Sequence, residues 1–167
     1  MEIERRITID VPAERAWSVV GDRFHDVGTW ASMIDASEAL AGTSGPAGQA
    51  HRACVTRQGT IQEKLVRFDA DNRTLAYEVL SGLPGFVRKG GNTWWVSRAG
   101  AGRSEVRFRM VFELSPVAGF FMGWMMKRQM SRMADDVADD LKRFLETGEV
   151  SPRKAASAER FALASAA

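Results

Sequence analysis

SPVAGFFMGWMMKRQMSRMADDVADDLKRFLETG, residues 115–148, is the stretch around which the rest of this 167-residue chain is organised. Ser115 can accept hydrogen bonds from the amides of a first helical turn, Pro116 suits the first helical position, and Gly148 supplies a stop. Apolar residues recur at steps of three or four, which places them on one helical face: Met126, Met130, Met133, Val137, Leu141 and Phe144. The stretch predicts one long helix with one buried face.

The sequence before this helix alternates between apolar and polar residues, which is typical of strands. Groups of turn-forming residues divide it into expected strands over residues 2–11, 37–41, 50–57, 60–68, 74–80, 91–98 and 104–114. Two short helices are expected after the first strand, over residues 12–22 and 24–34. We therefore expect an α+β fold in which a seven-stranded antiparallel sheet buries one face against the long helix.

Length and composition fit a single globular domain that can bury a core, since 45% of the residues are hydrophobic and 26% are charged. Residues 1–147 form the expected ligand-binding domain. Residues 148–167 are small and polar apart from Phe161 and Leu163, with nothing obvious to bury against. We expect them to form a flexible tail.

Charge and cysteine content argue against several classes of protein. The net charge of +2 is too small to predict nucleic-acid binding. The single cysteine, Cys54, excludes an internal disulfide, and the charged opening MEIERRITID lacks the apolar run of a secretion signal, so a cytoplasmic protein is expected. The apolar run 117–126 is shorter than the roughly 20 residues that cross a bilayer. The two histidines lack metal-ligand spacing, so neither a metal nor a cofactor is expected.

Arg52 and Glu63 are the first candidates for chemistry. They fall on consecutive expected strands joined by a short turn, and the alternation of side chains puts both on one face of the sheet, together with Cys54. Periodicity alone leaves open whether this face or the opposite one points inward. Inside, the pair could bind a polar head group, orient a carbonyl, or let Glu63 move a proton while Arg52 stabilises negative charge. Outside, it would be a surface ion pair worth about 0–1 kcal/mol.

Further residues are candidate ligand contacts. Tyr77 and Asn92 could supply polar groups to a cavity or could satisfy backbone partners, and Trp94 and Trp95 are consecutive, so one points to each face of the sheet. The expected apolar lining between sheet and helix is Trp94, Phe108, Met110, Phe112, Met126, Met130 and Met133. Methionine fills irregular space, which suits a changeable ligand, although ordinary core packing explains the same pattern.

The start of the long helix is apolar nearly all round. Phe120, Phe121, Trp124 and Met125 lie there beside two glycines. Such a segment is compatible with a cavity entrance, with transient contact at a membrane surface, or with a dimer contact. The sequence therefore leaves a monomer and a homodimer open.

The order of the elements and several residues resemble one known family. Residues 12–17 look like its P-A-x-x-x-W opening, and Phe24 and Trp30 look like its D-F-x-x-x-x-x-W stretch. Later positions resemble its G-x-x-x-R … G … E-x-L … D … Y progression: Gly48, Arg52, Gly59, Glu63, Leu65, Asp69 and Tyr77. Over about residues 1–147 the chain resembles the START/Bet v 1-like (SRPBCC) superfamily, in the branch called polyketide cyclase/dehydrase and lipid transport.

This resemblance implies a helix-grip fold, in which a curved sheet wraps the long C-terminal helix and leaves a cavity between them. It places Arg52 and Glu63 inside that cavity and implies a small hydrophobic ligand, such as a lipid, a polyketide or another aromatic or isoprenoid-like molecule. The alternative that it implies is a polyketide cyclase, aromatase or dehydratase. In such an enzyme Glu63 would be the acid/base and Arg52 the electrostatic stabiliser.

Overall fold

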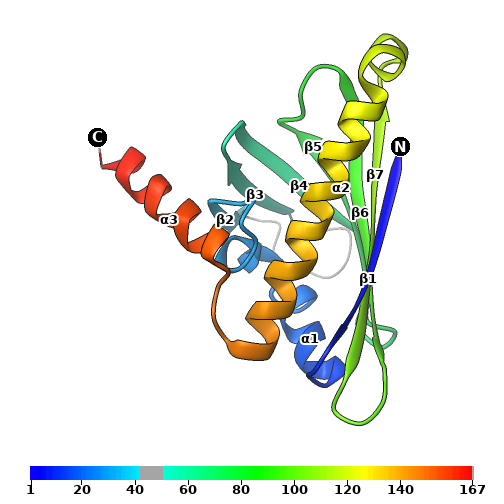
Figure 1. Cartoon of the computed structure of the whole chain (residues 1–167), viewed down its shortest axis with the longest axis vertical. Helices are drawn as coiled ribbons and strands as arrows, with labels where there is room; N and C mark the ends of the chain where they lie inside the picture. The colour runs from blue at the N-terminus through cyan, green and yellow to red at the C-terminus, as the bar shows by residue number, and fades with distance from the viewer. Residues whose placement is uncertain (42–50, 167) are drawn as a thin grey trace.

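The computed structural model describes residues 1–41 and 51–166 (Figure 1). Within these residues one sheet contains β1 (Glu2–Ile9), β2 (Ala36–Ala39), β3 (His51–Thr56), β4 (Gly59–Asp69), β5 (Thr74–Ser81), β6 (Val87–Arg98) and β7 (Ser104–Leu114). The helices are α1 (Ala13–Val20), the 3-10 helix η1 (Phe24–Thr29), α2 (Pro116–Thr147) and α3 (Pro152–Ser165). The curved antiparallel sheet, the short helices and the long helix α2 confirm the predicted helix-grip α+β fold.

The strands follow the order β1-β7-β6-β5-β4-β3-β2, so each strand after β2 pairs with its neighbour in sequence and β1 pairs with β7. Alternation in β7 explains which face is covered: Val106, Phe108 and Met110 are buried, and Arg107 lies on the other face, 4.0 Å from the centre of the Trp95 ring. Helix α2 crosses the covered face and contacts β1 and β7 (Figure 1).

Helix α2 buries its second half more deeply than its first. Gly148, with a φ of 75°, ends the helix as predicted. The buried apolar residues among those described in α2 are Met126, Ala134, Val137, Ala138, Leu141 and Leu145, whereas Met130, Met133 and Phe144 are only partly buried. The first turns of α2 extend past the sheet, at the end of the molecule opposite α1 (Figure 1). The predicted apolar stripe is therefore present, but its packed part is displaced towards the C-terminal end.

Several predicted boundaries differ from the structure. The first strand ends two residues before the predicted end, at Ile9, and β6 begins at Val87 rather than at residue 91. The second short helix is a 3-10 helix that ends at Thr29, five residues earlier than expected. Gly48 and Ala50, which belong to the predicted resemblance and to a predicted strand, lie outside the described residues.

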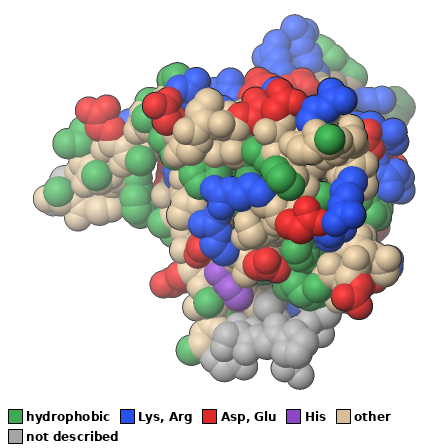
Figure 2. All heavy atoms as spheres, turned by 90° about the horizontal axis from the view of Figure 1, so that it is seen from below, with side chains coloured by type: hydrophobic (Ala, Val, Ile, Leu, Met, Phe, Trp, Pro, Cys, Tyr) green, Lys and Arg blue, Asp and Glu red, His purple; other side chains and the backbone are tan. Residues whose placement is uncertain are grey.

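Helix α3 occupies most of the segment that was predicted to be a flexible tail. Ser151 caps this helix by accepting from the Lys154 amide at 3.1 Å. Lys154 is only 4% exposed, and its ammonium donates to the Ile34 carbonyl at 2.6 Å, while the Ser157 hydroxyl donates to the Asp35 carboxylate. These contacts are polar, so a search for apolar residues to bury could not find them. Beyond them α3 extends away from the domain (Figures 1 and 2).

Candidate functional site

Arg52 and Glu63 lie opposite each other on β3 and β4, and both side chains are buried on the face that α2 and η1 cover. The Arg52 Nε donates to Glu63 Oε2 at 2.5 Å, and each residue is 5% exposed. The turn between the strands supports this register: Gly59 has a φ of 126°, a conformation that a residue with a side chain disfavours. The question that periodicity left open is answered in favour of the inward face.

Helix η1 covers the Arg52 side chain. The guanidinium donates to the Phe24 carbonyl, and its carbon lies 3.9 Å from the centre of the Phe24 ring and 4.9 Å from that of Tyr77. Burial alone would lower the pKa of Arg52, but the negative charge of Glu63, with smaller effects from Tyr77 and Cys54, raises it above its ordinary value. The site therefore holds a permanent positive charge between two aromatic rings.

Two further titratable side chains face the ion pair, and both stay protonated at neutral pH. The Cys54 thiol donates to Glu63 Oε2 at 3.6 Å, and burial raises the pKa of Cys54 to about 12, so it is a poor nucleophile. Burial and the Glu63 charge also raise the pKa of Tyr77, so its phenol keeps its proton. The Asn92 amide donates to the Tyr77 hydroxyl at 3.4 Å, while the buried Asn92 Oδ1 has no partner among the described residues. The structure thus places Tyr77 beside Arg52 and Asn92 beside Tyr77, and a role for both in ligand contact stays a prediction.

Aromatic rings fill most of the space beside this cluster. Trp94 stacks on Phe108 with ring centres 4.5 Å apart, and Trp30 meets Trp94 edge-on at 6.5 Å. The pocket left next to Arg52 measures about 30 Å³, which holds no more than a few water molecules. It is lined by residues of α1, η1 and the sheet: Val19, Val20, Arg23, Phe24, Val27, Trp30, Arg52, Leu75, Tyr77 and Trp94.

The residues expected to line an apolar cavity between sheet and long helix are buried or partly buried in the described part of the chain. Phe108 is fully buried, Met110 and Met126 are buried, and three others are partly buried against the core: Phe112, Met130 and Met133. None of these six residues lines the pocket beside Arg52. Sequence analysis could not foresee how deeply each residue is buried, because burial depends on contacts between distant segments, such as the stacking of Trp94 on Phe108. A role for the six residues in ligand contact stays a prediction.

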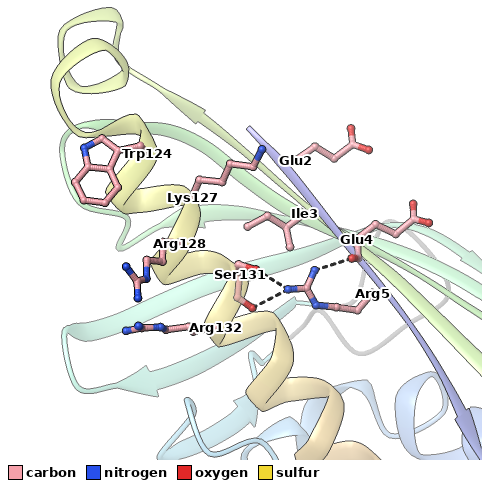
Figure 3. A pocket seen from close by; sticks show the side chains of 9 residues that line it. All are labelled: Glu2, Ile3, Glu4, Arg5, Trp124, Lys127, Arg128, Ser131 and Arg132. Atoms are coloured by element: carbon pink, nitrogen blue, oxygen red, sulfur yellow. Dashed lines mark hydrogen bonds between the residues drawn. The ribbon is translucent and has the colours of Figure 1, made fainter.

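A second, open groove of about 490 Å³ lies outside this interior, between β1 and the first half of α2 (Figure 3). Its lining residues are Glu2, Ile3, Glu4, Arg5, Trp124, Lys127, Arg128, Ser131 and Arg132. Arg5 donates to the Ser131 hydroxyl and to Asp135, both at 2.5 Å, and so ties β1 to α2. Sequence analysis missed this groove, although one signal was present: Arg5 interrupts the apolar face that Ile3 and Ile7 begin.

The described residues contain no group of three or more His, Cys, Asp and Glu side chains that could hold a metal ion. No described helix has the length and apolarity to span a bilayer.

Comparison with known proteins gives one family match. Residues 1–146 match the sequence profile of the family described as polyketide cyclase/dehydrase and lipid transport. A search of curated protein sequences finds no match.

Several solved structures share the fold. An uncharacterized protein from Bacillus thuringiensis is 19% identical with a TM-score of 0.71, over 87% of this chain and 98% of that one. The di-domain aromatase/cyclase BexL of the BE-7585A biosynthetic pathway is 14% identical with a TM-score of 0.69, over 86% of this chain and 45% of that one. Norcoclaurine synthase from Thalictrum flavum, solved with a transition-state analogue, is 14% identical with a TM-score of 0.66, over 87% and 93%. At these identities the similarity establishes the fold.

Proposed function

Because this chain belongs to the polyketide cyclase/dehydrase and lipid transport family, we propose that it binds one small, largely apolar molecule whose polar end contacts Arg52 and Glu63. The family and its structural relatives support a ligand-binding or cyclase role. A lipid, a polyketide, or another aromatic or isoprenoid-like compound fits a site that combines aromatic walls with one ion pair.

The buried ion pair is the observation that carries this proposal. Removing two charges from water costs several kcal/mol per ion, and hydrophobic residues of similar volume are often as stable or more stable. Stability is therefore a weak reason for Arg52 and Glu63 to occupy the interior at 5% exposure. Recognition of a polar group is a stronger one, because a charge held in a dry site interacts with its partner far more strongly than in water.

Ligand entry requires η1 to move, since a pocket of about 30 Å³ is about a tenth of the roughly 300 Å³ of a small ligand site. Helix η1 suits this role for two reasons. It is a 3-10 helix with a non-helical residue, Asp26, inside it, and such helices have weak internal hydrogen bonds. It also supplies Phe24, Val27 and Trp30 to the pocket wall, and the Phe24 carbonyl accepts from Arg52. A ligand that engages Arg52 would replace this contact and free η1.

Co-purification tests the proposal directly. The full chain, purified without denaturation, is measured by native mass spectrometry, and any released compound is identified after organic extraction. In parallel, binding of 8-anilinonaphthalene-1-sulfonate is titrated. We expect a bound small molecule in the first experiment and dye binding, displaced by the extracted compound, in the second.

A matched pair of variants locates the binding. Val27→Trp fills the pocket beside Arg52 and should abolish dye binding, whereas Val66→Trp places the same ring on the exposed surface of β4 and should leave it unchanged. Circular dichroism controls for folding. The proposal fails if no compound co-purifies and no dye binds, or if both variants bind like the wild type.

A catalytic role is the second candidate, and the arrangement around Glu63 favours it. Its Oε2 accepts from Arg52 and Cys54, and the Tyr77 phenol stays protonated. In a ring closure of the aldol type, Glu63 would take a proton from a carbon next to a ketone, Arg52 would stabilise the enolate oxygen, and Tyr77 is a suitable proton donor. Glu63→Gln separates the two candidates. An enzyme would bind a candidate polyketide normally but lose cyclisation, whereas a carrier would turn over nothing in either form.

A further inference from the structure

The first half of α2 exposes an apolar surface that no other described element covers. Of the nine large hydrophobic residues exposed in the described part of the chain, five lie within nine residues of each other here. We name them the apolar tip: Val117, Phe120, Phe121, Trp124 and Met125. Phe120 is 83% exposed and Trp124 is 72% exposed. Figure 1 shows this segment extending beyond the sheet at one end of the molecule.

The charged residues of α2 that lie nearest the apolar tip are all positive. Lys127, Arg128 and Arg132 follow it, and the first acidic residue of α2 is Asp135. These three cations form no ion pair within the described ranges 1–41 and 51–166, whereas Asp135 pairs with Arg5 at 2.5 Å. The groove that the cations border also contains two acidic side chains, Glu2 and Glu4. Arg109 lies 3.2 Å from Glu2 and 2.9 Å from Glu4, and Arg107 lies 4.0 Å from Glu4, so two arginines balance these two carboxylates and the unpaired charge beside the tip is positive.

The apolar tip and the three cations follow one another along the axis of helix α2. Trp124, Arg128 and Arg132 are spaced by four residues, and they extend to the same side of α2 in Figure 3. At 1.5 Å per residue, Arg128 lies about 6 Å from Trp124 along the helix axis, and Phe120 lies about 6 Å in the other direction. The headgroup layer on each side of a bilayer is about 5–8 Å thick. Helical side chains lean towards the N-terminus, so Arg128 and Arg132 point back towards the tip.

A hydrogen bond holds the start of α2 in this orientation. The Ser115 amide donates to the Phe86 carbonyl at 2.8 Å, which connects the first turn of α2 to the loop before β6. The exposed cation Arg88 lies two residues further on, at the same end of the sheet. The apolar tip is thus presented by a folded edge of the domain with a further positive charge beside it.

We propose that the first half of α2 docks on the surface of an anionic phospholipid bilayer, with Phe120, Phe121 and Trp124 inserted below the headgroups and Lys127 and Arg128 at the phosphates. Aromatic side chains prefer the membrane interface, and lysine and arginine favour anionic headgroups there. The groove between β1 and α2 offers room for a headgroup beside these cations.

A second copy of the chain fits this surface less well. A two-fold contact brings the same patch of both copies together, so the unpaired Lys127, Arg128 and Arg132 of each copy would approach those of the other. The nearest acidic residues on α2 offer no compensation, because Asp135 is paired with Arg5 and Asp136 with Arg153. A bilayer with negative headgroups supplies the missing charge. The docking surface shares no residue with the pocket beside Arg52. The proposal of membrane docking therefore does not depend on the proposal of an interior ligand.

Vesicle flotation of the full chain tests the proposal. The wild type is expected to float with vesicles of equal parts phosphatidylcholine and phosphatidylglycerol, to bind pure phosphatidylcholine much more weakly, and to detach as salt is raised. Lys127→Gln with Arg128→Gln should weaken binding to anionic vesicles by about fivefold per cation, because each basic residue near such a surface contributes about 1 kcal/mol. Arg67→Gln, at an exposed cation on β4, is the matched control and should bind like the wild type.

The apolar part is tested separately. Phe120→Ser with Trp124→Ser should abolish flotation, while Leu163→Ser removes an equally exposed apolar side chain from α3 and should not change it. Flotation that is absent in the wild type, or unaffected by the tip and cation variants, overturns the proposal. A dimer in light scattering that Trp124→Asp dissolves also overturns it, because a second copy would then cover the tip.

Discussion

The Arg52 guanidinium and the Glu63 carboxylate form an ion pair of 2.5 Å across the β3–β4 hairpin in a site where each residue is 5% exposed. At this exposure bulk solvent cannot stabilise either charge, so each depends on the other. Removal of either side chain alone leaves an unpaired charge in the interior. The mutual dependence of the two residues can therefore be measured as a loss of free energy of unfolding.

Removal of one member should be far more damaging than removal of both. Glu63→Leu leaves the Arg52 charge buried without its partner and should lower the free energy of unfolding by about 3–5 kcal/mol. Arg52→Met with Glu63→Leu removes both charges and should be close to the wild type or more stable. Urea unfolding of the wild type, both single variants and the double variant measures this. The double variant should still bind a hydrophobic dye but lose the polar ligand, whereas equal costs for single and double variants would contradict a mutually dependent pair.

Cys54 should make the protein less stable at alkaline pH. Its pKa is raised from 9.0 to about 12, so between these values the folded protein keeps a proton that the unfolded chain has released. The unfolded chain then binds fewer protons, and the free energy of unfolding falls with rising pH, by about 1.4 kcal/mol per pH unit for this one group. Below pH 9 the contribution is complete and independent of pH.

Cys54→Val isolates this effect, because the variant keeps Tyr77 and every other alkaline group. Urea unfolding between pH 8 and 11 should show a shallower decline for the variant than for the wild type. Iodoacetamide should also leave the wild-type thiol intact at pH 8 until urea unfolds the protein. Parallel pH curves, or rapid alkylation of the folded chain, would show that Cys54 is not buried beside Glu63.

Helix α3 should detach when its polar anchor is removed. Lys154→Ala with Ser157→Ala deletes the donors to Ile34 and Asp35. Alanine has a high helix propensity, so the substitutions should not weaken the helix itself. Any loss of protection from hydrogen exchange then results from loss of the anchoring contacts. We expect hydrogen exchange of the α3 amides to become fast while the sheet amides stay protected. Arg160→Ala changes an exposed residue of the same helix and should have no effect; unchanged exchange in the double variant would mean that other contacts hold α3.

The fold and the members of the site could be predicted because both depend on periodicity. The alternation of Val106, Phe108 and Met110 identified the covered face of β7, and the parity of a short hairpin placed Arg52 beside Glu63. Both follow from the two-residue period of a strand. The period of a strand does not determine the direction in which the hairpin curves. The family resemblance implied that Arg52 and Glu63 point inward, and the structure buries both side chains.

Other features depend on contacts between distant segments, which local patterns do not encode. The aromatic packing beside Arg52 includes the stacking of Trp94 on Phe108, and α3 is held by a lysine that reaches a backbone carbonyl 120 residues away in sequence. Neither feature produces a periodic pattern in the sequence. The Met-rich cavity was predicted from the residue types alone. The volume of such a cavity depends on the rotamers of all the side chains around it, which the sequence pattern does not give.

Movement of η1 leads to a last prediction, on Trp30. The Trp30 ring meets Trp94 edge-on at 6.5 Å across the pocket beside Arg52, and Phe24 lies 5.7 Å from Tyr77. A ligand larger than the pocket's 30 Å³ must separate these rings. Its binding should therefore change the near-UV circular dichroism and the fluorescence of the wild type.

Two tryptophan variants identify the source of this change. Trp30→Phe should remove most of it, because the reporter ring at the pocket is gone. Trp17→Phe should retain it, since Trp17 packs on Phe68 at 5.3 Å and does not line the pocket. If a ligand identified by mass spectrometry binds without any change at Trp30, the ligand does not occupy the space beneath η1, and the pocket beside Arg52 is not its site.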